Sequence, residues 1–105
     1  MPDFLPAREP ELVTWANTFA ANVAVIGVAN IGLVASQQTA LQAAVTAFVD
    51  AYELYKNPTT HTPPNFEAKR TKRQEMTDLI RQLAGIIQKH PGTTDQQRSS
   101  LGLTV

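Results

Sequence analysis

The sequence predicts an all-α fold, an up-down-up bundle of three long helices plus a short C-terminal helix. Apolar residues recur at alternating spacings of four and three positions in three separate stretches. Prolines stand between these stretches and not inside them. A chain of 105 residues is long enough for one domain with one modest core. We therefore expect a single helical domain over residues 1–105, with an N-terminal extension at 1–9 and a proline-rich loop at 57–64.

The first helix is expected from about Pro10 to about Asn30, because proline suits an opening turn, where its missing N–H costs no hydrogen bond. Its inner stripe is Leu12, Ala16, Phe19, Val23, Ile26 and Asn30. Gly32 is expected to stop this helix, and Ser36 to cap a second helix that reaches about Lys56. The second helix repeats the spacing with Leu41, Val45, Phe48, Tyr52 and Tyr55.

A third helix is expected from about Pro64 to Lys89. Its inner face carries Met76, Ile80, Leu83 and Ile87. The preceding segment, NPTTHTPPN, is rich in proline, threonine and asparagine, which predicts an extended loop and not a tight turn. Thr94 and Gln97 have the spacing of a capping box, which predicts one short helix from Asp95 to Ser100.

Basic residues concentrate at the start of the third helix, where Lys69, Arg70, Lys72 and Arg73 lie close together. One interpretation is ion pairing with Asp50 and Glu53 on the second helix, with cations stacked on neighbouring tyrosines. The other is a site for phosphate, nucleic acid or an acidic partner, whose affinity would fall steeply with salt. The chain has nine basic and nine acidic residues, so any such function must be local.

The opposite feature is a run of 38 residues, from Leu12 through Val49, without any charged side chain. Outside its inner stripe the first helix still carries small or apolar residues: Val13, Ala20, Ala21, Val25 and Val28. A helix that is apolar on all sides is usually surrounded by protein or lipid. Asparagines and two glycines interrupt the run, which argues against a membrane span of about 20 apolar residues. Either the bundle itself covers these five residues, or another protein surface does.

No catalytic, cofactor or metal site is predicted. His61 and His90 are the two histidines, each beside or near a proline at a predicted loop, and no HxxxH or HExxH spacing occurs. Neither GxSxG nor GxxxxGK[ST] is present, and there is no cysteine. The start, MPDFLPAREPE, lacks the basic patch and apolar run of a secretory signal. Localisation is therefore not predicted.

Three blocks, FLPAREPELVTWANTF, NIGLVASQQTALQ and PGTTDQQRSSLGLTV, resemble the N-terminal part of a group of uncharacterised bacterial two-domain proteins. In that group a helical domain is followed by a proline-rich linker and a β-sandwich similar to fibronectin type III. The group has no established activity, so the resemblance implies a fold and not a function. The basic cluster is heavier here than in the group, which puts any shared role for residues 69–73 in doubt.

The expected function is a non-catalytic structural or interaction module, not an enzyme. It would self-associate or dock a neighbouring domain through Val13, Ala20, Ala21, Val25 and Val28. The alternative is anion or nucleic-acid binding through Lys69, Arg70, Lys72 and Arg73.

Overall fold

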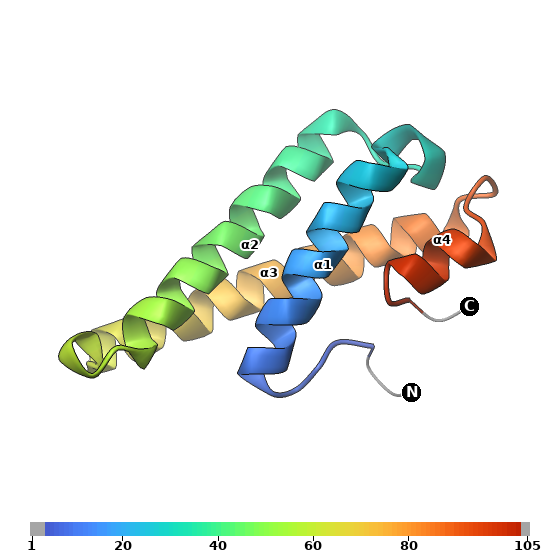
Figure 1. Cartoon of the computed structure of the whole chain (residues 1–105). Helices are drawn as coiled ribbons and strands as arrows, with labels where there is room; N and C mark the ends of the chain where they lie inside the picture. Colours follow the sequence, from blue (N-terminus) through green and yellow to red (C-terminus); the bar gives the residue numbers. More distant parts are fainter. Residues whose placement is uncertain (1–3, 104–105) are drawn as a thin grey trace.

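All regular structure in residues 4–103, the part of the chain that the computed structural model describes, is helical. The elements are α1 (Glu9–Ile26), the 3₁₀ helix η1 (Val28–Ile31), α2 (Ala35–Lys56), the 3₁₀ helix η2 (Pro58–Thr60), α3 (Pro63–Lys89) and α4 (Asp95–Ser100). This confirms the predicted all-α bundle of three long helices plus a short fourth (Figure 1). The first three residues of the predicted N-terminal extension, and the last two of the chain, lie outside the described part.

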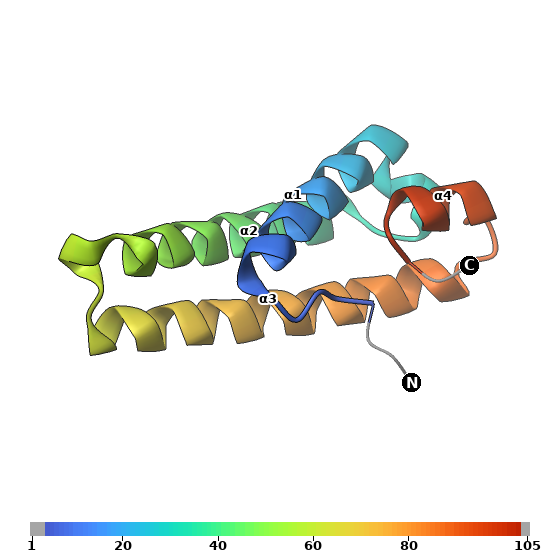
Figure 2. The same ribbon diagram turned by 60° about the horizontal axis from the view of Figure 1, so that its bottom comes forward.

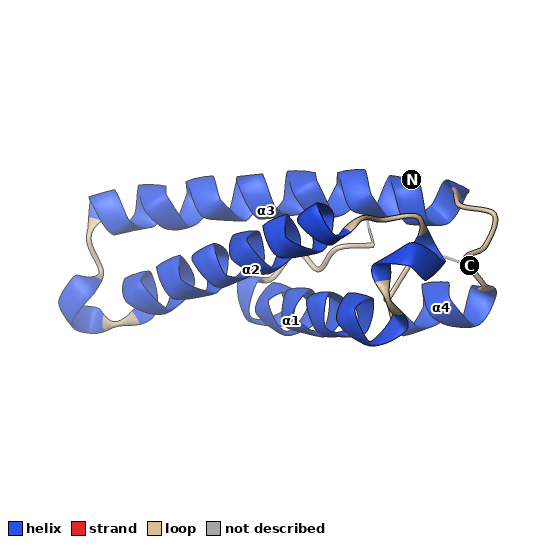
Figure 3. Cartoon of the chain, turned by 90° about the horizontal axis from the view of Figure 1, so that it is seen from above, coloured by secondary structure: helices blue, strands red, loops and turns tan. Residues whose placement is uncertain are grey.

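The bundle is elongated, with extents of 47 × 29 × 18 Å, because its longest helix, α3, has 27 residues and is about 40 Å long. α2 and α3 form a long antiparallel hairpin, and the shorter α1 lies against the first part of α2 (Figures 1 and 3). The tip of this hairpin, formed by the end of α2, η2 and the start of α3, projects beyond α1. We call this tip the arm, and the part where α1, α2 and α3 pack together the body. α4 packs back beside the end of α3, on the same side as α1.

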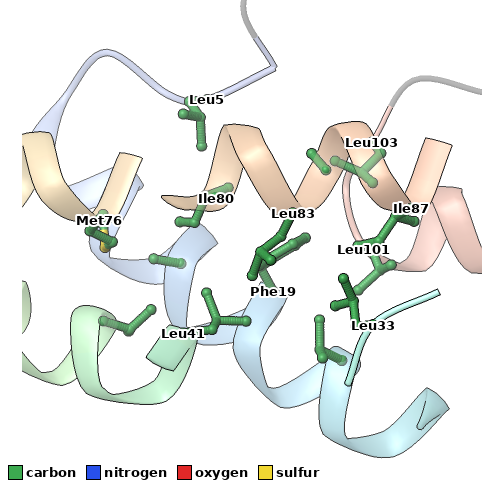
Figure 4. Packing of buried hydrophobic residues seen from close by; sticks show 14 of the residues in the cluster. Leu5, Phe19, Leu33, Leu41, Met76, Ile80, Leu83, Ile87, Leu101 and Leu103 are labelled. Atoms are coloured by element: carbon green, nitrogen blue, oxygen red, sulfur yellow. The ribbon is translucent and has the colours of Figure 1, made fainter. Parts of the chain in front are cut away.

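The core lies in the body and is built from the predicted apolar stripes. Its members from the three long helices are Leu12, Ala16, Phe19, Val23, Leu41, Val45, Phe48, Met76, Ile80, Leu83, Ala84 and Ile87. Leu5, Ile31, Leu33, Leu101 and Leu103 from the connecting and terminal segments complete it. Figure 4 shows Phe19, Leu41 and Leu83 converging between the helices. Burying these side chains supplies most of the stability of such a fold, at roughly 25 cal/mol per Å² of apolar area.

The first helix ends earlier than predicted, at Ile26 instead of near Asn30. Gly27 has φ +92°, a conformation that side-chain-bearing residues rarely adopt, and it turns the chain out of the helix. The Asn30 side chain then donates to the carbonyl oxygen of Ile26 at 2.7 Å and satisfies an end-group of α1. Val28 and Asn30 therefore belong to η1, and the prediction that they continue the first helix is wrong.

The connections are also tighter than predicted. α2 starts at Ala35, not after Ser36, because Val34 is extended and its N–H donates to Gln37 Oε1 at 2.8 Å. The proline-rich segment is compact: η2 occupies Pro58–Thr60, and α3 begins at Pro63. Asn57 accepts from the Thr59 N–H at 2.9 Å. The predicted extended loop is thus a short turn between two helices.

Both ends of the described chain meet on Trp15. The Trp15 ring stacks on Phe19, with centroids 5.0 Å apart, and contacts the ring of Phe4 at 5.5 Å. Gly102 lies against the edge of the same indole, where a Cβ would sit 2.7 Å from Nε1. The predicted capping box is present in α4, with Thr94 and Gln97 bonded reciprocally at 2.9 and 3.1 Å. The N- and C-terminal segments are therefore both held against the body at Trp15.

Candidate interaction surface

The five residues predicted to form the interface on the first helix do not share one face. Val13, Ala20 and Val28 are partly buried and pack against the molecule's own core. Ala21 and Val25 are exposed. Val25 is 83% exposed, the largest value among the large apolar side chains that remain accessible in residues 4–103. The bundle itself therefore covers three of the five residues, and the other two stay exposed, where another protein surface could cover them.

The outward surface of α1 is a stripe formed by Thr14, Thr18, Ala21 and Val25, which we call the uncharged face. All four are exposed, and their spacings of four, three and four positions place them on one side of the helix. Sequence reasoning missed Thr14 and Thr18 because it searched for apolar residues alone. Their spacing relative to Ala21 and Val25 was the signal that would have identified them.

A shallow groove of about 570 Å³ adjoins this face at the start of α1. Its lining includes Pro6, Pro10, Thr14, Trp15 and Thr18, and one charged residue, Glu11. Thr14 and Thr18 belong to both the groove and the uncharged face. The two features therefore form one continuous surface, apolar or weakly polar over most of its length.

The predicted basic cluster is divided by the fold. Lys69 is 8% exposed, and its Nζ lies 2.8 Å from Glu9 Oε1. The same ammonium group stands 4.4 Å from the centroid of the Tyr55 ring and 5.1 Å from that of Phe66. Lys69 is therefore a structural cation between α1, α2 and α3, and it is not accessible to an external anion.

Arg73 also contacts Glu9, with Nη1 3.6 Å from Oε2, and its Nη2 donates to the Ala7 carbonyl oxygen at 2.9 Å. Arg70 and Lys72 stay on the surface, where they face Glu67 and Glu75 of their own helix at 3.9 and 3.5 Å. The four cations thus do not present one continuous anion-binding surface.

The predicted pairing of this cluster with the second helix is wrong. Glu53 faces Lys56 on its own helix, at 3.9 Å, while the buried cation takes its carboxylate from Glu9. The prediction failed because it placed residues 1–9 outside the bundle, whereas Glu9 begins α1 beside α3. Glu9 is consequently the structurally important charged residue that sequence reasoning missed.

The two histidines lie at opposite ends of the hairpin that α2 and α3 form. The exposed His61 ring stacks on Tyr55 with centroids 4.0 Å apart, and its Nδ1 is 2.8 Å from the Tyr55 carbonyl oxygen. His90 follows the last residue of α3 and fills the space beside Gly32 and Gly92. Within residues 4–103 no three metal-ligating side chains converge. Across the same range no helix has both the length and the hydropathy needed to cross a membrane.

Comparison with protein families, with curated proteins and with solved structures found no match to this chain. The resemblance to the bacterial two-domain proteins therefore stays a prediction, and the surface itself must carry the functional argument.

Proposed function

We propose that this protein is a non-catalytic interaction module that binds a second copy of itself through the uncharged face of α1. The observation that carries the proposal is the exposure of Val25 at the end of a helix face that has no charge along its length. An exposed apolar side chain on such a face loses contact with water when a partner covers it, and that loss favours association.

Charge favours a second copy over an unrelated partner. In a two-fold dimer the same patch appears on both sides of the interface, so a patch of one charge sign would repel its copy. Residues 12–49 carry no charge, and the uncharged face lies entirely within them. The small side chain of Ala21 also lets two helices approach to the short end of the usual 8–10 Å range of interaxial distances.

The size of the surface indicates which parts take part. A stable interface buries about 800 Å² per partner, and α1, with 18 residues, is only about 27 Å long. The four residues of the uncharged face are too few to supply this area alone. The groove beside Trp15 continues the same surface, so we expect the partner copy to cover the groove as well.

The test is the absolute mass in solution, measured by light scattering after gel filtration over a concentration series at low and high salt. We expect a dimer that persists at high salt, because an apolar contact is not screened. Val25→Lys and Ala21→Lys should each shift the protein to a monomer, since both place a charge opposite its own copy. Leu54→Lys is the matched control: Leu54 is also an exposed apolar residue, but it lies on the arm.

Trp15 gives an independent readout, because it is the chain's single tryptophan and lines the groove. Its emission should shift to shorter wavelength as the dimer forms, and this shift should vanish in Val25→Lys. A strict monomer at every concentration would refute self-association. Dimers of unchanged stability in both lysine variants would refute this face as the contact.

A further inference from the structure

The groove beside Trp15 lies at one end of the uncharged face, and the exposed Val25 lies at the other. The N-terminal segment runs along α3 and turns into the first residue of α1 (Figure 2), and this turn brings Pro6 into the lining of the groove. The eleven positions from Thr14 to Val25 correspond to a rise of about 16 Å. A hollow and an exposed apolar side chain therefore share one surface, too far apart to meet within one molecule.

The spacing of the residues along the uncharged face reads the same in both directions. Thr14, Thr18, Ala21 and Val25 are separated by four, three and four positions. A copy of the helix can therefore be laid antiparallel on the first, with a two-fold axis between Thr18 and Ala21. In this register Thr14 faces the partner's Val25, and Thr18 faces the partner's Ala21. The smallest side chain of the face then lies beside the axis, where the two helices come closest.

Charge disfavours the parallel alternative. Glu11 lies three positions before Thr14 and continues the same side of α1, and its contact with Arg8, at 3.7 Å, is exposed and weak. A parallel pair would place Glu11 opposite its own copy. The antiparallel pair separates the two carboxylates by about 25 Å along the helices, well beyond the Debye length of about 8 Å at physiological salt.

The polar group at the centre of the groove already has a partner within the chain. The Thr14 hydroxyl donates to the Pro10 carbonyl oxygen at 3.3 Å, so a second copy can cover it without leaving that donor unpaired. Pro6 and Pro10, which line the same groove, have no backbone N–H to satisfy. Covering the groove with an apolar side chain therefore breaks few hydrogen bonds to water.

On the basis of the self-association inferred above, we propose that the dimer is an antiparallel pair of α1 helices in which the partner's Val25 enters the groove beside Trp15. Each dimer then contains two such contacts, one on each side of the two-fold axis. The groove extends from Thr18 back to Pro6, so the residues that follow the partner's Val25 lie over it as well. The groove and Val25 are thus two halves of one contact.

Cysteine cross-linking tests this register, because the chain has no cysteine of its own. A disulfide requires two Cα atoms within about 7 Å of each other. Thr14→Cys mixed with Val25→Cys in a glutathione buffer should give a disulfide-linked heterodimer, and so should Thr18→Cys mixed with Ala21→Cys. Val25→Cys alone should link poorly, since its own copy lies about 16 Å away along the helix. Intact mass spectrometry distinguishes the heterodimer from both homodimers.

Leu54→Cys is the matched control, because Leu54 is an exposed apolar residue on the arm. Its mixture with Thr14→Cys measures linking by random collision. The yield from Thr14→Cys with Val25→Cys should be at least about tenfold higher, since the effective concentration inside a complex reaches the millimolar range. Val25→Cys keeps an apolar side chain. If it nevertheless weakens the dimer, the mixture of Thr18→Cys with Ala21→Cys, which leaves Val25 in place, decides the register.

Two results would overturn the register while leaving self-association in place. One is efficient linking of Val25→Cys to itself, which would mean a parallel pair. The other is a yield no higher than that of the Leu54→Cys control in both mixtures, although the wild type is a dimer by light scattering. A wild type that stays monomeric at every concentration would refute the proposed function, and the register with it.

The light-scattering mass of the wild type therefore distinguishes a failure of the proposed function from a failure of this register.

Discussion

At the residue scale, Glu9 explains how a lysine occupies a position where the apolar stripe of α3 continues. Its carboxylate is the partner of both Lys69 and Arg73, and the rings of Tyr55 and Phe66 also lie close to the Lys69 ammonium. A charge that has left water requires such compensation, because an unpaired buried ion costs several kcal/mol. One acidic residue at the start of α1 thereby joins α1 to α3.

Glu9→Gln should lower the free energy of unfolding by about 2 kcal/mol, because it leaves the Lys69 ammonium buried without its anionic partner. Urea denaturation measures the change. The double variant Glu9→Gln/Lys69→Met should be more stable than Glu9→Gln alone, since it removes the uncompensated charge as well. Glu53→Gln serves as the control: its pair with Lys56 is exposed, so its effect should stay below about 0.5 kcal/mol. Equal costs for the two single substitutions would contradict this role of Glu9.

Two glycines should respond in opposite directions to the same substitution. Gly102 has φ +77° and lies against Trp15, so Gly102→Ala should cost about 2 kcal/mol from backbone strain and crowding. Gly85 lies inside α3, and a Cβ there would meet nothing within 4 Å. Gly85→Ala should therefore stabilise the protein by about 1 kcal/mol through helix propensity. Thermal unfolding of both variants checks this, and a stabilising Gly102→Ala would show that the indole does not confine that position.

At the element scale, the apolar stripes made the helices and their inner faces predictable. The apolar stripe residues between Leu12 and Val23 on α1, and between Met76 and Ile87 on α3, are buried as their periodicity indicates. The apolar pattern does not determine where a helix ends or which charged residues are buried. The end of α1 depends on the backbone conformation of Gly27, and the burial of Lys69 depends on a partner 60 positions away. The contact between the N-terminal segment and α3, in which Arg73 donates to the Ala7 carbonyl oxygen, is likewise specified by no local pattern.

The two-helix arm should be the least stable part of the long helices. The buried residues of α2 end at Phe48 and those of α3 resume at Met76, with Lys69 alone between them. Few buried apolar contacts mean a low cost of local opening. Amides in residues 50–56 and 66–72 should therefore exchange with deuterium faster than those in residues 41–48 and 76–87. Equal protection throughout α2 and α3 would mean that the hairpin opens only with the whole molecule.

At the scale of the whole molecule, charge divides the protein into two regions. The charged residues belong to the N-terminal segment, the first turn of α1, the arm, α3 and the C-terminal part, while residues 12–49 carry none. Those residues form most of α1, all of η1 and more than half of α2. The proposed dimer contact lies in the neutral region.

Self-association would also link thermal stability to protein concentration. When only the folded chain dimerises, mass action stabilises it, and for two chains of this size each tenfold rise in concentration should raise Tm by about 3 °C. High salt should leave this dependence in place, since the contact is uncharged. Val25→Lys should abolish the dependence and keep its Tm near that of the dilute wild type, because Val25 is 83% exposed and contributes little to the core. A wild-type Tm that is independent of concentration would mean that α1 keeps its uncharged face in water, and that the chain acts as a monomer.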